Sequence, residues 1–260
     1  MKAKALLVSI ICGVIFTGCS SREVSINRYN TSSQNTTYST AGYTKRSSNI
    51  LIESSEVSYT SKKIDVPIIC QYPELPTGCE STAAVMVLQY YGVDITATRF
   101  AQEWLECDDS FYWLDNVLYG PDPDEVFAGT PFSKSSYGCF AAPIVNAVND
   151  NSLDCTAEKI TDMSLEELCT EYINNNKPIL IWATMGMKKS QKGRTWILPD
   201  GSEYNWIAGE HCLVLLGYDE DYYFLNDPQT GELSSYKKEL VENRFEELGS
   251  QAVYINRNDH

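Results

Sequence analysis

The order of its segments predicts that this chain has an α+β fold. Helix-like segments occupy the first half of the region after Lys62, and short apolar segments with strand character follow in the second half. Helices that precede antiparallel strands, without regular alternation, are typical of α+β domains. The 198 residues left after Lys62 suffice for one domain with a real core. We therefore expect a single domain over residues 63–260.

The composition excludes several classes of protein. The chain has 260 residues, with 20 Lys plus Arg against 35 Asp plus Glu, which gives a formal charge of −15. Such an acidic composition argues against binding to the negatively charged backbone of a nucleic acid. The only histidines are His211 and His260, which excludes a zinc site built on several histidines. We expect no metal and no cofactor, and any imidazole chemistry must use His211.

The N-terminus has the layout of a secretory signal. Lys2 and Lys4 precede an apolar stretch over residues 5–16, and small residues then lead to Cys19. The Phe-Thr-Gly-Cys sequence resembles the lipobox of bacterial lipoproteins. This resemblance implies that the signal peptide, residues 1–18, is removed and that Cys19 is lipidated. A plain signal peptide followed by an unrelated cysteine is the alternative.

Residues 19–62 have the composition of a flexible tether. From Ser20 to Lys62, 23 of 43 residues are Ser, Thr, Asn or Gln, so little apolar surface is available to offset the entropy of ordering. Together with a lipidated Cys19, the tether predicts a protein anchored to the outer face of the bacterial cytoplasmic membrane. We expect the domain beyond it to be a monomer.

Local patterns place the elements of the domain. The segment from Cys79 to Tyr91 is apolar almost all round, as a buried helix is, and Gly92 can end it. Further helices are predicted at 96–106, 141–149, 164–175, where Ser164 begins a capping box, and 235–248. Strands are predicted at 179–184, 212–217 and 222–226, with a last edge strand at 252–255. Residues 108–134 are predicted to form a long segment on the surface, which we call the surface excursion.

Cys79 is a candidate nucleophile because it stands where a Gly-Cys turn becomes a helix N-terminus. Backbone N–H groups and the helix dipole favour a thiolate there. Any single cysteine can instead be a small buried hydrophobic residue or one partner of a disulfide bond. Six other cysteines lie in the domain, at 70, 107, 139, 155, 169 and 212, and we do not expect a full disulfide framework among them.

Three further side chains have the chemistry to assist this thiol. His211 begins a strongly apolar strand and can reach a neighbouring thiol from the rim of the core. The next strand ends in Asn226-Asp227, which offers an amide or a carboxylate to orient the imidazole. Gln71, eight residues before Cys79, can donate an N–H to an oxyanion.

The segment Gln71–Ser81, together with His211–Asp219 and Asn226–Gly231, resembles the standalone relatives of the bacteriocin-processing, double-glycine leader peptidases. These belong to the papain-like cysteine peptidases. The resemblance implies a papain-like fold with a nucleophile helix in an N-terminal helical half and an antiparallel sheet in the C-terminal half. It also implies that Cys79 is the nucleophile, His211 the general acid/base, Asp227 the orienting residue and Gln71 the oxyanion donor, acting on a peptide or protein.

Strand parity leaves the choice between Asn226 and Asp227 open. A hairpin turn of three or five residues puts Asp227 on the face of His211, whereas a turn of two or four residues puts Asn226 there. The family resemblance favours Asp227.

Two expectations concern ionisation. The helix N-terminus and His211 predict a pKa for the Cys79 thiol below the roughly 8.5 of a free cysteine. Glu80 is expected on the flank of the helix, with little effect on that thiol.

Other functions remain compatible with these residues. The domain could be a catalytically inactive papain-like module that binds a peptide, or a thiol hydrolase acting on peptidoglycan stem peptides. Acyl transfer is a further alternative to hydrolysis, and the sequence contains no scissile motif.

Overall fold

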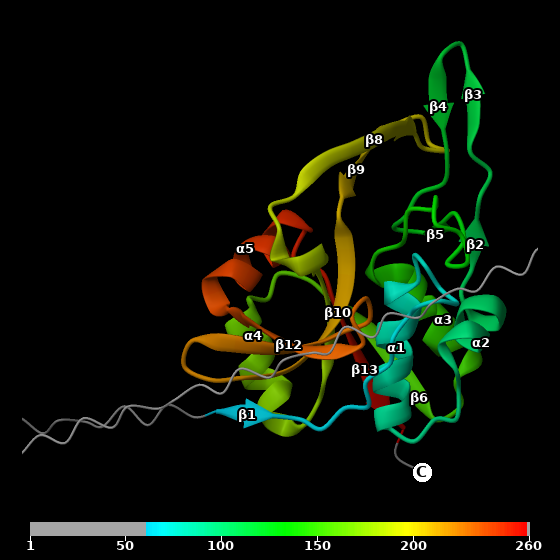
Figure 1. The fold of residues 1–260 in the computed structure, drawn as a ribbon. Helices are drawn as coiled ribbons and strands as arrows, with labels where there is room; N and C mark the ends of the chain where they lie inside the picture. The colour runs from blue at the N-terminus through cyan, green and yellow to red at the C-terminus, as the bar shows by residue number, and fades with distance from the viewer. Residues whose placement is uncertain (1–60, 259–260) are drawn as a thin grey trace, which may run out of the picture. The chain divides into compact units, whose positions relative to one another are not determined.

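The computed structural model describes residues 61–258, so the predicted signal peptide, Cys19 and nearly all of the tether lie outside the described residues. A seven-stranded antiparallel sheet forms the centre, in the order β12-β11-β10-β7-β13-β6, with β1 beside β10 (Figure 1). Its strands are β1 (Lys62–Lys63), β6 (Cys155–Ile160), β7 (Ile179–Thr184), β10 (Glu210–Tyr218), β11 (Tyr222–Asp227), β12 (Glu232–Lys237) and β13 (Ala252–Arg257).

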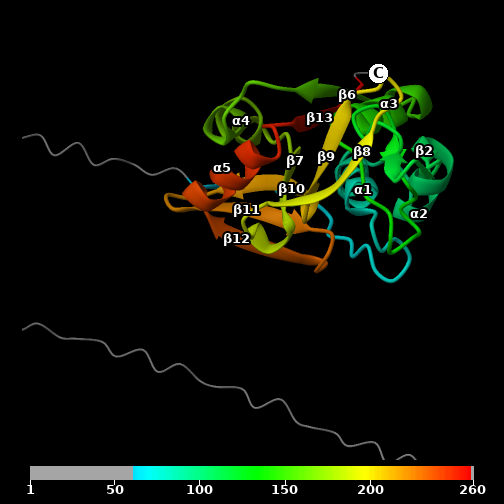
Figure 2. The same ribbon diagram turned by 90° about the horizontal axis from the view of Figure 1, so that it is seen from above.

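Helices cover both faces of this sheet. The helices α1 (Cys79–Tyr90) and α3 (Ala141–Asn151) pack on one side, with the short α2 (Ala97–Arg99) beyond them. The helices α4 (Leu165–Glu171) and α5 (Lys238–Glu247) lie on the other side (Figure 2). Short turns extend three of these elements: a π-helical turn at Phe100–Trp104 and 3₁₀ turns at Ile173–Asn175 and Met185–Met187.

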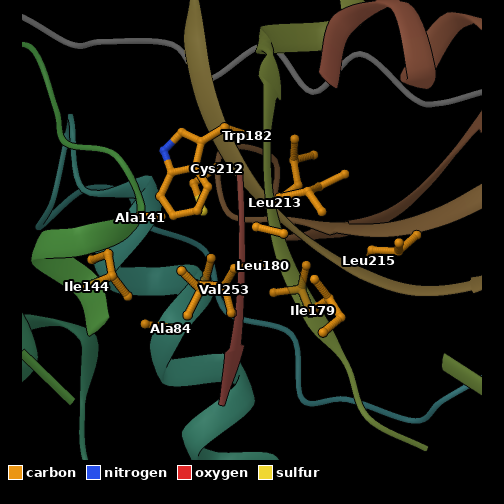
Figure 3. Close-up of a cluster of buried hydrophobic side chains, with 14 of the residues drawn as sticks. Ala84, Ala141, Ile144, Ile179, Leu180, Trp182, Cys212, Leu213, Leu215 and Val253 are labelled. Atoms are coloured by element: carbon orange, nitrogen blue, oxygen red, sulfur yellow. The ribbon is translucent and has the colours of Figure 1, made fainter. Parts of the chain in front are cut away.

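The core explains why β7 and most of β10 are apolar. Both strands are buried along nearly their whole length because each has helices on both faces. Trp182 and Cys212 point towards α1 and α3, whereas Leu213 and Leu215 point to the opposite side (Figure 3). The Trp182 indole Nε1 donates a 2.9 Å hydrogen bond to the Cys139 carbonyl, so this large side chain is buried without an unpaired donor.

A second, smaller sheet is joined to the first one. Its order is β3-β4-β8-β9, formed by β3 (Tyr112–Leu114), β4 (Val117–Tyr119), β8 (Gln191–Ile197) and β9 (Glu203–Ala208). Two further short strands, β2 (Cys107–Asp108) and β5 (Phe127–Ala128), pair in parallel. Strand β9 continues into β10 through Gly209, whose φ of +85° favours glycine (Figure 1). The two sheets are therefore joined directly before His211.

The fold class is confirmed, and several details of the expected elements are wrong. Strand β13 is not an edge strand, because β6 pairs with its outer side. The surface excursion contains the β3–β4 hairpin and the fully buried Phe127. The helix expected at 235–248 begins only at Lys238, after β12. Across residues 61–258, no helix combines the length and apolar character needed to cross a bilayer.

Candidate active site

Cys79 is the first residue of α1, directly after a tight loop. The loop is closed by hydrogen bonds from the Leu75 N–H to the Gln71 carbonyl and from the Gly78 N–H to the Leu75 carbonyl, at 2.8 and 3.1 Å. A Cβ on Gly78 would lie 2.7 Å from the Leu75 Cβ, so only glycine fits there. Thr82 then fixes the first turn through its hydroxyl, which donates to the Gly78 carbonyl at 2.8 Å. The thiol is thus held on a rigid, buried platform.

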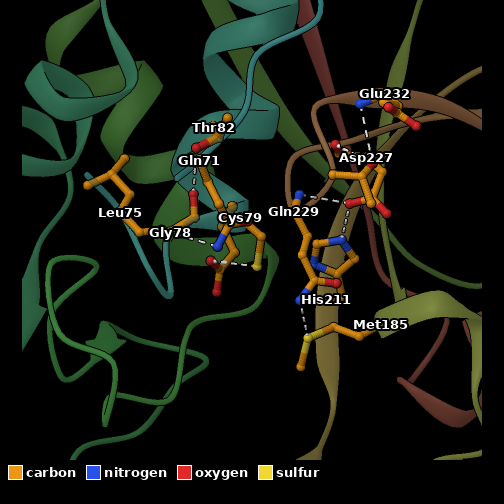
Figure 4. A network of polar contacts seen from close by, with 12 residues as sticks. Gln71, Leu75, Gly78, Cys79, Thr82, Met185, His211, Asp227, Gln229 and Glu232 are labelled. Carbon is orange, nitrogen blue, oxygen red and sulfur yellow. Dashed lines mark hydrogen bonds and ion pairs between the residues drawn. The ribbon is translucent and has the colours of Figure 1, made fainter. Parts of the chain in front are cut away.

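His211 and Asp227 form a buried hydrogen-bonded pair. The His211 Nε2 lies 2.7 Å from the Asp227 Oδ1, and the Gln229 N–H donates to the same oxygen at 2.8 Å (Figure 4). Burial opposes ionisation of Asp227, but the hydrogen bonds and charge of His211 outweigh it, so the pKa of the carboxyl is lowered. Because Asp227 engages Nε2, the second ring nitrogen, Nδ1, remains for a thiol.

A β-bulge decides which residue faces His211. Tyr218 pairs with Tyr223, so the hairpin turn has an even number of residues, which by itself would put Asn226 on the face of His211. The register shifts by one between Leu215 and Gly217, and this shift brings Asp227 to that face instead. Asn226 turns away, and its Nδ2 donates to the carbonyls of Val66 and Pro67.

One pocket of about 270 Å³ is lined by both candidate groups. Cys79 and His211 share it with the aromatic side chains of Tyr72, Tyr137 and Trp206. Within the described part of the chain, the thiol makes its hydrogen bond to the Glu80 Oε2, at 3.2 Å, and none to His211. The structure therefore places the Cys79 thiol and the His211 imidazole in one pocket. The thiol points to the Glu80 carboxyl group and not to the imidazole.

The expected position of Glu80 is wrong. Its side chain is fully buried rather than on the helix flank, and its Oε1 accepts a 2.8 Å hydrogen bond from the Cys139 N–H. Burial raises the pKa of Glu80 to about 7. Burial also raises the pKa of the Cys79 thiol, and the nearby charges of Glu80 and Glu210 raise it further. The expected lowering of the thiol pKa is therefore also wrong, because a helix N-terminus does not offset burial beside two carboxyl groups.

Glu210 completes this group of buried acids, and sequence reasoning missed it. Its side chain is 6% exposed, and burial followed by the charge of Glu80 raises its pKa. Two signals pointed to such a cluster. Glu80 is a charged residue in a helix that is otherwise apolar all round, and Glu210 stands beside the only histidine inside the domain.

Gln71 lies in the same pocket, with its amide already engaged. Its Nε2 donates to the carbonyls of Leu75 and Pro76, at 3.1 and 3.2 Å, while its buried Oε1 has no hydrogen-bond partner within residues 61–258. In this arrangement the side chain braces the loop before Cys79. It can donate to an oxyanion only by releasing one of these carbonyls.

Cys79, Glu80 and Glu210 are also the one group of potential metal ligands in the described region, with ligand atoms within 4.8 Å of one another. The two Glu80 oxygens already have the Cys139 N–H and the Cys79 thiol as partners, so the group is organised by hydrogen bonds. All seven cysteines between residues 61 and 258 are free thiols.

Helices before an antiparallel sheet, with a cysteine that begins α1 and a buried His–Asp pair whose histidine lines the same pocket, define a papain-like peptidase fold. The chain belongs to the Peptidase_C39 like family, whose model matches residues 63–253. The family resemblance seen in the sequence is thereby confirmed.

Three known proteins are similar to this chain over most of its length. The uncharacterized protein YvpB of Bacillus subtilis (strain 168) is 27% identical over 206 residues, which cover 78% of this chain and 79% of that protein. The crystal structure of a putative C39-like peptidase from Bacillus anthracis is 27% identical and aligns with a TM-score of 0.68 over 77% of this chain and all of its own. The peptidase domain of Streptococcus ComA, a bi-functional ABC transporter, gives 14% identity and a TM-score of 0.45 over 75% of this chain and all of its own.

Proposed function

We propose that this protein is a cysteine peptidase that hydrolyses peptide bonds through Cys79, His211 and Asp227. The observation that carries this proposal is the buried His211–Asp227 hydrogen bond of 2.7 Å, in one pocket with Cys79. Family membership supports a peptide substrate. No cofactor is needed for this chemistry.

The steps follow from the geometry. The thiol proton passes to the His211 Nδ1, and the imidazolium is stabilised by the Asp227 carboxylate at Nε2. The sulfur attacks the substrate carbonyl, His211 returns the proton to the leaving amine, and water hydrolyses the acyl-enzyme. The Cys79 N–H, which as the first of α1 has no acceptor within the helix, donates to the oxyanion, joined by Gln71 once it releases the Pro76 carbonyl.

The substrate is a peptide or protein at the outer face of the cytoplasmic membrane. Residues 19–62, lipidated at Cys19 after removal of residues 1–18, would hold the domain there. Double-glycine leaders are processed at exporters on the cytoplasmic side, so this location favours a different peptide.

An active-site electrophile tests the proposal. A vinyl-sulfone or epoxysuccinyl peptide should label Cys79, and a peptide library should be cleaved by the wild type. Cys79→Ala should lose both the labelling and the peptide cleavage, because it lacks the nucleophile. Its melting temperature should stay at the wild-type value, because the variant loses only one sulfur atom from the first turn of α1. Cleavage retained by Cys79→Ala above a few per cent would refute the assignment of the nucleophile.

A further inference from the structure

We propose that Glu80 and Glu210 are a proton-sharing carboxyl pair that controls whether Cys79 is a resting thiol or a reactive thiolate. This inference rests on the proposed function and adds two residues to its machinery. Glu80 contacts the reacting sulfur directly, and Glu210 acts through Glu80.

The first observation is that two acids are buried together without a cation. Glu80 is 0% and Glu210 6% exposed, and their carboxyl groups lie within 4.8 Å of each other. In the described region, neither forms an ion pair with a lysine or arginine. Two buried carboxylates at this separation cannot both ionise without a large cost, so the pair keeps a proton.

The backbone closes over the pair and fixes it. A Cβ on Gly138 would lie 2.5 Å from the Glu80 Oε1 and 3.0 Å from the Glu210 Oε2, so only glycine allows the chain to approach both groups. The Cys139 N–H holds Glu80 from the same side, at 2.8 Å. The Glu210 Oε1 has no partner among the described residues, which suits a group that exchanges a proton.

The groups around the pair come from every element that packs on it. Cys79 shares α1 with Glu80, and His211 and Cys212 adjoin Glu210 on β10. Cys139 lies before α3 and Cys107 on β2, and burial, followed by the charge of Glu80, raises the pKa of both thiols. The Trp182 indole on β7 opposes the rise of the Glu210 pKa. The pKa of Tyr204 on β9 is raised by burial, then by the charges of Asp124 and Glu210.

The protonation state of Glu80 reverses its effect on the sulfur. When Glu80 is ionised, it accepts the thiol hydrogen at 3.2 Å, which keeps the proton on sulfur and the thiol turned from His211. When Glu80 is protonated, its O–H donates to the sulfur instead. The S–H proton then moves to the His211 Nδ1, and the thiolate–imidazolium pair is stabilised. With the pKa of Glu80 at about 7, this change falls near neutral pH.

The experiment measures the iodoacetamide reactivity of Cys79 in the full chain from pH 5.5 to 8, read by mass spectrometry of the Cys79 peptide. Glu80→Gln imitates the protonated carboxyl at every pH. Its alkylation rate should match the wild type within about threefold at pH 5.5 and exceed it by at least about tenfold at pH 8, because an ionised Glu80 opposes the thiolate only in the wild type. Glu210→Gln imitates the partner that keeps the shared proton, so it should leave the wild-type transition near the same pH.

Glu171→Gln provides the matched control, since it makes the same change of charge at an exposed site on α4. It should reproduce the wild-type profile. A ratio of Glu80→Gln to wild-type rates that is constant across pH would overturn the inference, because a purely structural effect acts equally at every pH. A wild-type profile that changes on addition of a chelator would also overturn it, by showing that the cluster binds a metal ion. Since alkylation needs no turnover, these outcomes are separate from failure to cleave peptides.

Discussion

The buried carboxyl of Glu80 should make the stability of the protein depend on pH in a defined way. The pKa of Glu80 is raised from 4.5 to about 7 in the folded state. A carboxyl whose folded pKa is raised contributes stability that is fully present below pH 4.5 and is lost as the pH rises through 7. The shift is about 2.5 units, and at 1.36 kcal/mol per unit the loss is about 3 kcal/mol.

Glu80→Gln isolates this contribution. Glutamine keeps the acceptor for the Cys139 N–H but cannot ionise, so the variant should not show the loss. Relative to the wild type, its free energy of unfolding should rise by about 3 kcal/mol between pH 4.5 and pH 8. Carboxyl groups away from the Glu80–Glu210 pair, such as Asp227 with its lowered pKa, titrate alike in both proteins and cancel in the difference.

Urea unfolding of both proteins at half-unit pH steps gives this difference directly. Equal slopes of free energy against urea concentration are required, so that the midpoints report stability alone. A difference between the two proteins that stays constant within about 0.5 kcal/mol, or that falls as the pH rises, would refute the reasoning. Glu80 would then be ionised throughout, and a compensating cation would have to lie near it.

Two further predictions concern the triad and the anchor. Asp227→Asn should lower kcat/KM by on the order of a hundredfold, because an amide cannot stabilise the imidazolium, whereas Asn226→Ala should lower the melting temperature and leave kcat/KM near the wild-type value; equal losses of activity in the two variants would contradict the assignment. Cys19→Ser should move the protein from the membrane fraction to the soluble fraction, since a lipid on Cys19 is the anchor we propose; a mature wild-type N-terminus that mass spectrometry shows to be unmodified would refute this.

The sequence predicts those elements whose local pattern agrees with their tertiary setting. Helix α1 begins at Cys79 as expected. A long apolar segment bounded by Gly78 and Gly92 can be buried with all its backbone hydrogen bonds formed if it is a helix. The capping box at Ser164 forms as its spacing predicts. The strand at Ile179–Thr184 has the predicted bounds, since six consecutive buried residues leave no other interpretation.

What the sequence did not predict depends on contacts between distant segments. The β3–β4 hairpin escaped notice because its strands have three residues each and its turn uses Asp115 and Asn116 at positive φ without a glycine. The interior position of β13 depends on β6, whose sequence Cys-Thr-Ala-Glu-Lys-Ile has no apolar run and no regular alternation. The position of Asp227 depends on the bulge between Leu215 and Gly217, and an apolar strand shows no sign of where such a bulge falls.

The carboxyl pair and the proposed catalytic pair cannot be adjusted independently, because they are neighbours in sequence. Glu80 follows Cys79 on α1, and Glu210 precedes His211 on β10, so one packing contact between this helix and this strand sets the distances within both pairs. Successive residues of a strand point to opposite faces, which lets β10 direct His211 to Asp227 and Glu210 to Glu80 from adjacent positions. Any change that moves α1 along β10 would therefore alter the reactivity of the thiol through two routes at once. Substitutions that preserve shape, such as glutamine for glutamate, are needed to separate them.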